Sequence, residues 1–267
     1  MRWIALLLLP LSTGCISPAI ARFEQANVYQ PAGPTVGNWS PQGIDIEDAW
    51  FASADGTELH GWYVPHPHPR AVVLVCHGNA GNVTHRANLI RSLHAHHDVA
   101  LLVFDYRGFG RSTGTPNEQG ILSDARAARG WLADRTGQRE EDIVLFGRSL
   151  GGGVAVDLAA HDGARGLVLV NTFSSLPEVA RHHMSLLPAG LLMKNRLASA
   201  DKIDAYHGPL LQLHARDDKV IPARLGSKLH AAANDPKQLL LVDGMGHNGP
   251  LPVEFHRAFH AFVDALP

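Results

Sequence analysis

The sequence predicts an α/β fold: a mostly parallel sheet of about eight strands with helices on both faces. Two patterns carry this prediction. Near-continuous apolar runs alternate with stretches typical of helices, and such runs indicate strands buried on both faces of a parallel sheet. Ahead of them, two strand-like segments flank Ala54-Asp55-Gly56, which is a hairpin signal. We therefore expect an antiparallel hairpin at the N-terminal end of this sheet.

The expected elements follow one another along the chain. The hairpin strands are 46–53 and 57–64, and the buried strands are 71–76, 99–105, 142–147, 166–171, 209–214 and 238–243. Helices are expected at about 83–97, 118–135, 150–161, 222–234 and 251–265. The longest break in the alternation, about 174–207, predicts a small helical cap inserted into a single domain that spans 44–267.

The first 21 residues predict export. Met1-Arg2-Trp3 is a short positive start, and the apolar run I-A-L-L-L-L-P-L that follows is typical of a signal peptide. It is too short to span a bilayer, which takes about 20 apolar residues. Two cleavage sites compete. L-S-T-G-C resembles a lipoprotein box with Cys15 as the lipidated residue, whereas A-I-A, ending at Ala21, suits an ordinary signal peptidase. We favour cleavage before Cys15 because this cysteine directly follows the apolar run.

Either cleavage leaves an exported protein in which residues 22–43 form a tether or a loosely attached N-terminal arm. With a lipid on Cys15, the protein would be anchored to a membrane of the bacterial cell envelope. In a Gram-negative source, Ile16 favours the outer membrane, because an aspartate at that position commonly retains lipoproteins at the inner one. Cleavage after Ala21 would give a periplasmic or secreted protein. The other cysteine, Cys76, ends an apolar strand and is expected to be a buried free thiol.

Composition excludes some classes of function. A net charge of -2, a pI near 6.8 and the lack of any Lys/Arg run argue against nucleic-acid binding. Seven of the 17 histidines lie in three short clusters, at 66–69, 94–97 and 182–183. None of the clusters has an established metal-ligand spacing, so we expect solvated surface histidines and no metal site. The sequence leaves the oligomeric state open.

The stretch I-V-L-F-G-R-S-L-G-G-G-V, residues 143–154, ends a buried strand in G-x-S-x-G and opens a helix. Gly147 and Gly151 flank Ser149 and permit a sharp turn that would expose this serine as a nucleophile. The N–H of Leu150 begins the helix, so it has no partner within the helix and lies where negative charge would develop. The motif therefore predicts a catalytic serine.

A serine nucleophile needs a base, and the base needs an acid to orient it. The strand at 209–214 leads into A-R-D-D-K-V-I-P, which offers Asp217 and Asp218 as acids. The last strand leads into G-M-G-H-N-G, which offers His247 as the base. The chain order of serine, aspartate and histidine is the one that this kind of sheet requires.

The strand at 71–76 ends in H-G-N-A-G-N, residues 77–82. Its small residues let the backbone approach the serine closely. We expect the backbone N–H of Asn79 to join that of Leu150 in an oxyanion hole, where one donor is typically worth about 10²–10³ in rate.

Together these motifs resemble the α/β-hydrolase superfamily of serine hydrolases over roughly residues 44–265. More narrowly, H-G-N-A-G-N, F-D-Y-R-G-F-G-R-S-T-G, G-R-S-L-G-G, the D-x-V-I-P turn and the final G-H-N are similar to serine aminopeptidase-like, lysophospholipase-like and depalmitoylase-like families. In these families the acid lies four residues before the proline of the D-x-V-I-P turn, which implies Asp218 rather than Asp217. The resemblance also implies that Asp105 and Arg107 brace the floor of the site in a buried polar network.

The resemblance implies an exported serine hydrolase that cleaves carboxylic ester or thioester bonds through an acyl-enzyme on Ser149. Its substrate would be a small or lipid-like molecule, and no metal or organic cofactor is needed. Two alternatives stay open: an aminopeptidase-like amide hydrolase, and a non-enzymatic envelope lipoprotein. Apolar residues of the cap, S-L-L-P-A-G-L-L-M at 185–193, would line an acyl pocket, touch a bilayer or pack on the domain beneath.

Overall fold

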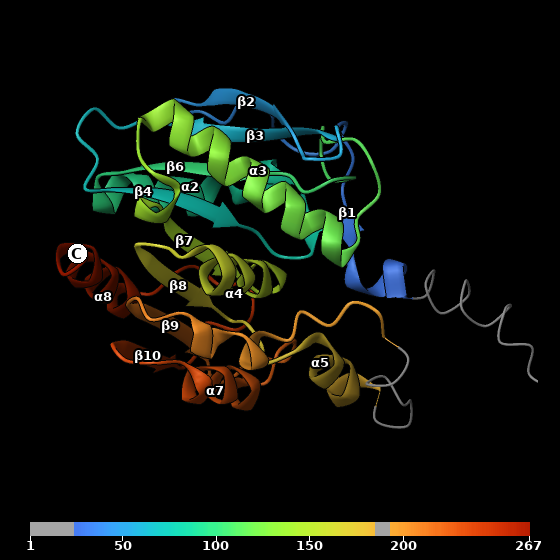
Figure 1. Cartoon of the computed structure of the whole chain (residues 1–267), viewed down its shortest axis with the longest axis vertical. Helices are drawn as coiled ribbons and strands as arrows, with labels where there is room; N and C mark the ends of the chain where they lie inside the picture. The colour runs from blue at the N-terminus through green and yellow to red at the C-terminus, as the bar shows by residue number, and fades with distance from the viewer. Residues whose placement is uncertain (1–23, 185–192) are drawn as a thin grey trace, which may run out of the picture.

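The computed structural model describes residues 24–184 and 193–267 (Figure 1). Its main sheet has the strand order β10-β9-β8-β7-β4-β6-β3-β2. The strands are β2 (Glu47–Ala52), β3 (Glu58–Val64), β4 (Ala71–Cys76), β6 (Val99–Phe104), β7 (Val144–Arg148), β8 (Gly166–Val170), β9 (Leu210–Ala215) and β10 (Lys237–Val242). The strands from β10 to β6 run parallel, whereas β3 is antiparallel to both β6 and β2. The predicted α/β fold and its N-terminal hairpin are confirmed.

Helices cover both faces of the sheet (Figure 1). On one face lie α2 (Ala87–His97) and α8 (Val253–Asp264), and on the other lie α3 (Glu118–Thr136), α4 (Leu150–Asp162) and α7 (Ala223–Ala232). The expected helix at 83–97 begins as a 3-10 turn, Val83–Arg86. This turn starts after Asn82, whose side chain accepts from the Thr84 N–H and caps it.

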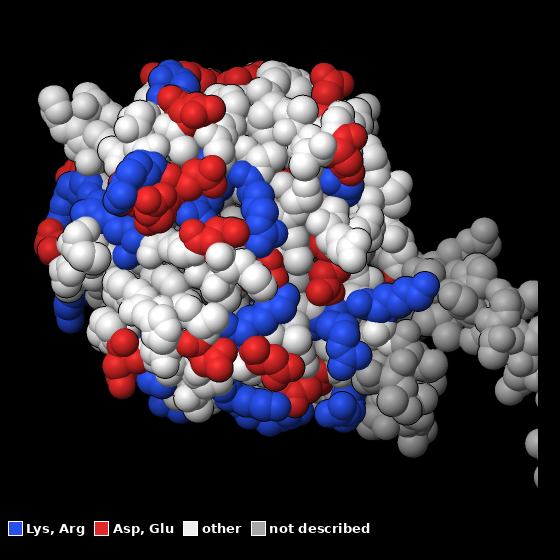
Figure 2. Space-filling model, in the orientation of Figure 1, with Lys and Arg blue, Asp and Glu red and all other residues white. Residues whose placement is uncertain are grey.

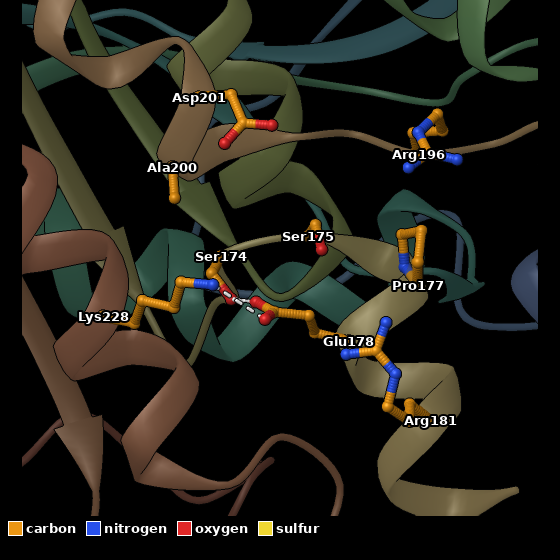
Figure 3. Close-up of a pocket in the computed structure, with 9 residues that line it drawn as sticks. All are labelled: Ser174, Ser175, Pro177, Glu178, Arg181, Arg196, Ala200, Asp201 and Lys228. Atoms are coloured by element: carbon orange, nitrogen blue, oxygen red, sulfur yellow. Dashed lines mark hydrogen bonds and ion pairs between the residues drawn. The ribbon is translucent and has the colours of Figure 1, made fainter. Parts of the chain in front are cut away.

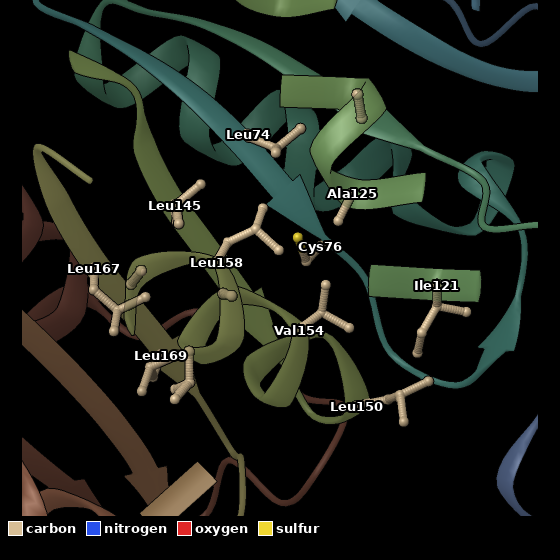
Figure 4. Packing of buried hydrophobic residues seen from close by; sticks show 14 of the residues in the cluster. Leu74, Cys76, Ile121, Ala125, Leu145, Leu150, Val154, Leu158, Leu167 and Leu169 are labelled. Atoms are coloured by element: carbon tan, nitrogen blue, oxygen red, sulfur yellow. The ribbon is translucent and has the colours of Figure 1, made fainter. Parts of the chain in front are cut away.

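The core explains why the central strands read as continuous apolar runs. Alternate residues of one strand face opposite sides, so Leu74 packs with Val154 and Leu158 of α4, whereas Val73 and Val75 belong to the cluster beneath α2 and α8 (Figure 4). Cys76 lies in the first cluster as a free, buried thiol, as predicted.

The described part of the N-terminal arm is packed against the domain, which corrects our expectation of a tether or loosely attached arm. Residues 24–28 are helical, and the short strand β1 (Gln30–Pro31) pairs in parallel with β5 (Ala80–Gly81). Tyr29 is only 3% exposed. The loop-forming composition did not reveal the pairing partner fifty residues away.

One of the histidine clusters also differs from prediction. His97, the last residue of α2, is buried rather than solvated. Its ring stacks on that of His256 in α8, with 5.2 Å between centroids, and meets Phe259 edge-on. The helices α2 and α8 contact each other here, and the His97 ring packs against side chains of α8.

The cap region holds α5 (Leu176–His183) and two 3-10 turns, Ser199–Asp201 and Ile203–Ala205. Most of the apolar stretch at 185–193, the two cleavage sites and Cys15 lie outside the described residues. Within the described ranges, no helix is both long and apolar enough to cross a membrane. On the face seen in Figure 2, acidic and basic side chains are interspersed.

Candidate active site

Ser149 lies on a strained turn between β7 and α4. Its φ of 55° and ψ of -120° fall where residues other than glycine are rare, and such a conformation costs about 1–3 kcal/mol. The flanking glycines allow this turn to pack tightly. A Cβ on Gly151 would lie 2.0 Å from the Cys76 carbonyl oxygen, and one on Gly147 would lie 2.5 Å from the Gly151 carbonyl oxygen. The two glycines are therefore required by close backbone approach.

Three of the predicted residues form a continuous hydrogen-bonded chain. His247 Nε2 lies 3.0 Å from Ser149 Oγ, and His247 Nδ1 lies 2.7 Å from Asp218 Oδ2. Because a carboxylate only accepts, Nδ1 carries the proton, and Nε2 is left to accept the proton of the serine hydroxyl. The order of the side chains is that of an acid, a base and a nucleophile.

Asp218 is held in its ionised form. Its Oδ1 accepts from the backbone N–H groups of Val220 and Ile221, both at 2.8 Å, at the turn after β9. Burial acts to raise the pKa of this carboxyl, but the hydrogen bonds from His247 and the two N–H groups outweigh it and hold the pKa below its ordinary value. Asp217 instead accepts from the Gly246 N–H at 3.2 Å, and no hydrogen bond joins it to His247 within the described residues.

The loop at residues 77–82, which we call the oxyanion loop, runs directly beside the serine. A Cβ on Gly78 would lie 3.4 Å from Ser149 Cβ. The backbone N–H groups of Asn79 and Leu150 donate to no other group in the described part of the chain. Both predicted donors therefore have their N–H groups available, Leu150 directly after Ser149 in the chain and Asn79 directly after Gly78 in the loop that contacts it.

Two residues that sequence reasoning missed hold the loop of His247. Arg148 Nη2 donates to the carbonyl oxygens of His247 and Gly249 at 2.8 and 3.0 Å. Asn171 Nδ2 donates to the His247 carbonyl at 2.9 Å, and its Oδ1 accepts from the Ala215 N–H. For Asn171, the one signal in the sequence was that an asparagine directly follows an apolar strand. Asparagine tolerates a positive φ better than most residues, and the φ of Asn171 is 47°.

Asp105 and Arg107 both make buried polar contacts, but in two separate sets. The Arg107 guanidinium binds the carboxylate of Asp124, with Nη2 to Oδ1 at 2.7 Å.

The second set lies at the oxyanion loop. Asp105 accepts from the Val83 N–H at 2.8 Å, and burial raises its pKa to about 7. His77 donates from Nδ1 to the Gly78 carbonyl at 2.6 Å, and burial together with Arg86 lowers its pKa to about 3. Asp105 and His77 thus lie at the two ends of the oxyanion loop, 3.7 Å apart from Oδ1 to Nε2, whereas Arg107 is bound to Asp124 and Asp55.

A polar cavity of about 370 Å³ opens beside α5 (Figure 3). Glu178 lies in it between Lys228, at 2.8 Å, and the hydroxyl of Ser174. Its lining does not include Ser149, Asp218 or His247, so the cavity is separate from these three hydrogen-bonded side chains.

Across residues 24–184 and 193–267, no group of three or more His, Cys, Asp or Glu side chains is arranged to hold a metal ion.

Comparisons with known proteins show the family to which the chain belongs. A family model described as serine aminopeptidase, S33, matches residues 67–199. An uncharacterized protein of Mycobacterium tuberculosis is 40% identical over 228 residues, which are 84% of this chain and 80% of that protein. The α/β-hydrolase domain-containing protein WAV2 of Arabidopsis thaliana is 31% identical over 242 residues, 82% of this chain and 79% of its own length.

Among solved structures, the esterase Pf2001 of Pyrococcus furiosus superposes with a TM-score of 0.74. The two share 20% identity, and the match covers 89% of this chain and 99% of the esterase. At this identity the likeness shows the fold.

Proposed function

The chain belongs to the α/β-hydrolase superfamily, and from this we propose that it is a serine hydrolase acting on carboxylic esters or thioesters. The observation that carries the proposal is the chain of hydrogen bonds from Asp218 through His247 to Ser149, at 2.7 and 3.0 Å. A hydroxyl whose proton can pass to a neutral imidazole is an activated nucleophile.

In the proposed reaction, Ser149 Oγ attacks the carbonyl carbon of the substrate while its proton passes to His247 Nε2. The imidazolium that forms is stabilised by the ionised Asp218. Negative charge on the carbonyl oxygen is met by the N–H groups of Asn79 and Leu150. His247 then gives its proton to the departing alcohol or thiol. Water, deprotonated by the same imidazole, cleaves the acyl-enzyme and regenerates Ser149.

The first test is hydrolysis of nitrophenyl esters from acetyl to palmitoyl, with Ser149→Ala as the blank. We expect a rate that depends on Ser149, and complete labelling of Ser149 by a fluorophosphonate probe. A rate that peaks at short chains would indicate a small closed pocket, whereas one that holds at long chains would favour lysolipid or acyl-protein substrates. Absence of both turnover and labelling at Ser149 would contradict the proposal and favour a non-enzymatic envelope protein.

A second candidate is cleavage of amides, which is favoured by the description of the matching family model as a serine aminopeptidase. The same residues would act, with an amine as the leaving group. Aminoacyl nitroanilides, assayed beside the esters, separate the two. A kcat/KM for nitroanilides above that for every ester would make the peptidase the better assignment.

We further propose that the protein is exported and anchored through a lipid on Cys15, and that in a Gram-negative cell it lies at the outer membrane. The position of Cys15 at the end of the apolar run supports this. In the producing cell, Cys15→Ala should move the protein from the membrane fraction to the soluble exported fraction. A variant that stays with the membranes would show that another surface anchors it. Release of the unaltered protein, processed after Ala21, would favour the periplasmic or secreted form.

A further inference from the structure

We propose that residues 24–37 of the N-terminal arm, called the arm from here on, are a positioning element for catalysis: they fix the oxyanion loop so that the Asn79 N–H is oriented before substrate binds. This proposal rests on the function proposed above. In Figure 1 the arm, coloured blue, lies beside the start of α3 and carries β1. The arm is remote in sequence from Ser149, and the family model that matches residues 67–199 does not include it.

The arm holds Asn79 by both its backbone and its side chain. The Gln30 N–H donates to the Asn79 carbonyl oxygen at 2.8 Å. The Asn79 side chain in turn donates from Nδ2 to the Val28 carbonyl oxygen at 3.1 Å. Two residues further on, the Ala32 N–H donates to the Gly81 carbonyl oxygen at 3.0 Å, which completes the pairing of β1 with β5. The carbonyl oxygen and the side-chain Nδ2 of Asn79 are thus both bound to the arm, whereas its backbone N–H donates to no group in the described residues.

The arm follows the oxyanion loop to its end. Asn82, which is fully buried, donates from Nδ2 to the carbonyl oxygens of Gly33 and Val36 at 3.2 and 3.0 Å. At Gly37 the arm passes so close to the loop that a Cβ there would lie 1.8 Å from Thr84 Oγ1. The contact therefore extends from Val28 to Gly37 and includes backbone groups that few side-chain changes would remove.

At its other edge, the arm binds the segment by which the chain leaves the cap. Tyr29 donates from its hydroxyl to Asn195 Oδ1 at 2.7 Å, and burial raises the pKa of Tyr29 well above its ordinary range, so the phenol stays a donor. The Glu24 carboxylate accepts from the backbone N–H groups of Lys194 and Asn195 at 3.1 and 2.5 Å. The arm thus joins the oxyanion loop to the cap.

This support matters because the oxyanion loop contains few large side chains that could fix it. Its sequence, H-G-N-A-G-N, has Gly81 at a φ of 80° and Gly78 against Ser149. A donor accelerates the reaction only if it is already oriented, since reorienting it during the reaction would cost part of the stabilisation. Backbone hydrogen bonds from the arm restrict the loop to one orientation. Their loss should weaken binding of the transition state more than binding of the substrate.

The test removes a single N–H of the arm in the full-length protein. Gln30→Pro deletes the donor to the Asn79 carbonyl, and Gln30→Ala, at the same exposed position, keeps it. With nitrophenyl acetate we expect Gln30→Pro to lower kcat about 10–100-fold, with KM changed less than about threefold. Gln30→Ala should match the unaltered protein. The pH profile should keep its shape, because the contact between His247 and Asp218 is not altered.

A second readout separates positioning from loss of structure. Affinity for a trifluoromethyl ketone, whose adduct places an oxyanion in the same hole, should fall in Gln30→Pro by about the same factor as kcat. A folded Gln30→Pro that keeps its kcat, or loses ketone affinity no more than Gln30→Ala does, overturns the proposal. If Gln30→Pro does not fold, Ala32→Pro against Ala32→Ser makes the same comparison at the donor to Gly81. If the unaltered protein neither hydrolyses esters nor is labelled at Ser149 by the fluorophosphonate probe, the proposed function itself is wrong, and the proposal about the arm falls with it.

Discussion

His247 and His97 make similar hydrogen bonds for different purposes. His247 lies 3.0 Å from Ser149 Oγ and 2.7 Å from Asp218, whereas His97 Nε2 lies 2.9 Å from His256 Nδ1. Both are largely covered by the surrounding protein. The difference lies in the partners: His247 joins a carboxylate to a hydroxyl, whereas His97 Nδ1 has no hydrogen-bond partner in the described structure.

The comparison shows that distance and burial alone do not identify a base. An imidazole that gains a proton needs an anion to stabilise it, and Asp218 supplies one to His247. His97 faces His256, His96, His260 and the cation of Arg70, and burial with these neighbours lowers its pKa to about 4. A ring that resists protonation suits packing between α2 and α8 and does not suit catalysis.

The largest expected effect tests the carboxylate. Asp218→Asn removes the charge beside His247 and can donate where the imidazole must donate, so the wrong ring nitrogen would carry the proton. We expect kcat for ester hydrolysis to fall by about 10³–10⁴ with the fold retained. Steady-state kinetics together with circular dichroism would measure both.

The neighbouring residue provides a matched control. Asp217→Asn makes the same change one position away, where the side-chain oxygen can still accept from the Gly246 N–H. We expect its kcat to stay within about twofold of the unaltered protein. Equal losses in the two variants would mean that charge near the loop matters in general, and that the contact of Asp218 with His247 is not special.

From the sequence, candidate site residues could be chosen where a suitable side chain directly follows a predicted strand. Ser149, Asp218 and His247 each follow a strand of the parallel sheet, and the carboxyl ends of such strands meet at one edge. Periodicity and turn residues determine where these strands end, and both are visible in a single sequence.

The features that were missed depend on contacts between distant segments. The arm binds the oxyanion loop mostly through backbone groups, which carry no sequence signal of their own. Arg148 holds the His247 loop across 99 residues of chain, and an arginine beside a nucleophile could equally face solvent. His97 was expected at the surface because a solvated histidine is the ordinary reading, and it is the packing of α2 against α8 that buries it.

The smallest expected effect tests the packing histidine. His97 binds its proton less tightly in the folded state, with a pKa of about 4, than at its ordinary value of 6.5. The unfolded chain therefore takes up more protons as pH falls from 6.5 toward 4, and the folded state loses stability over that range. His97→Phe cannot titrate and keeps an aromatic ring against Phe259. Between about pH 7 and about pH 5, we expect the variant to lose less unfolding free energy than the unaltered protein does, by on the order of 1 kcal/mol.

Urea unfolding at the two pH values measures this difference. Because only the change in unfolding free energy with pH is compared, any effect of the new ring on packing that is the same at both pH values cancels. His68→Phe, at an exposed position, is the control and should retain the pH dependence of the unaltered protein. If His97→Phe loses as much stability on acidification as that control, other groups dominate the acid response. His97 would then be comparable to a surface histidine in its titration despite its burial. In that case burial would not distinguish it from His247, and the contrast between the two would rest on their hydrogen-bond partners alone.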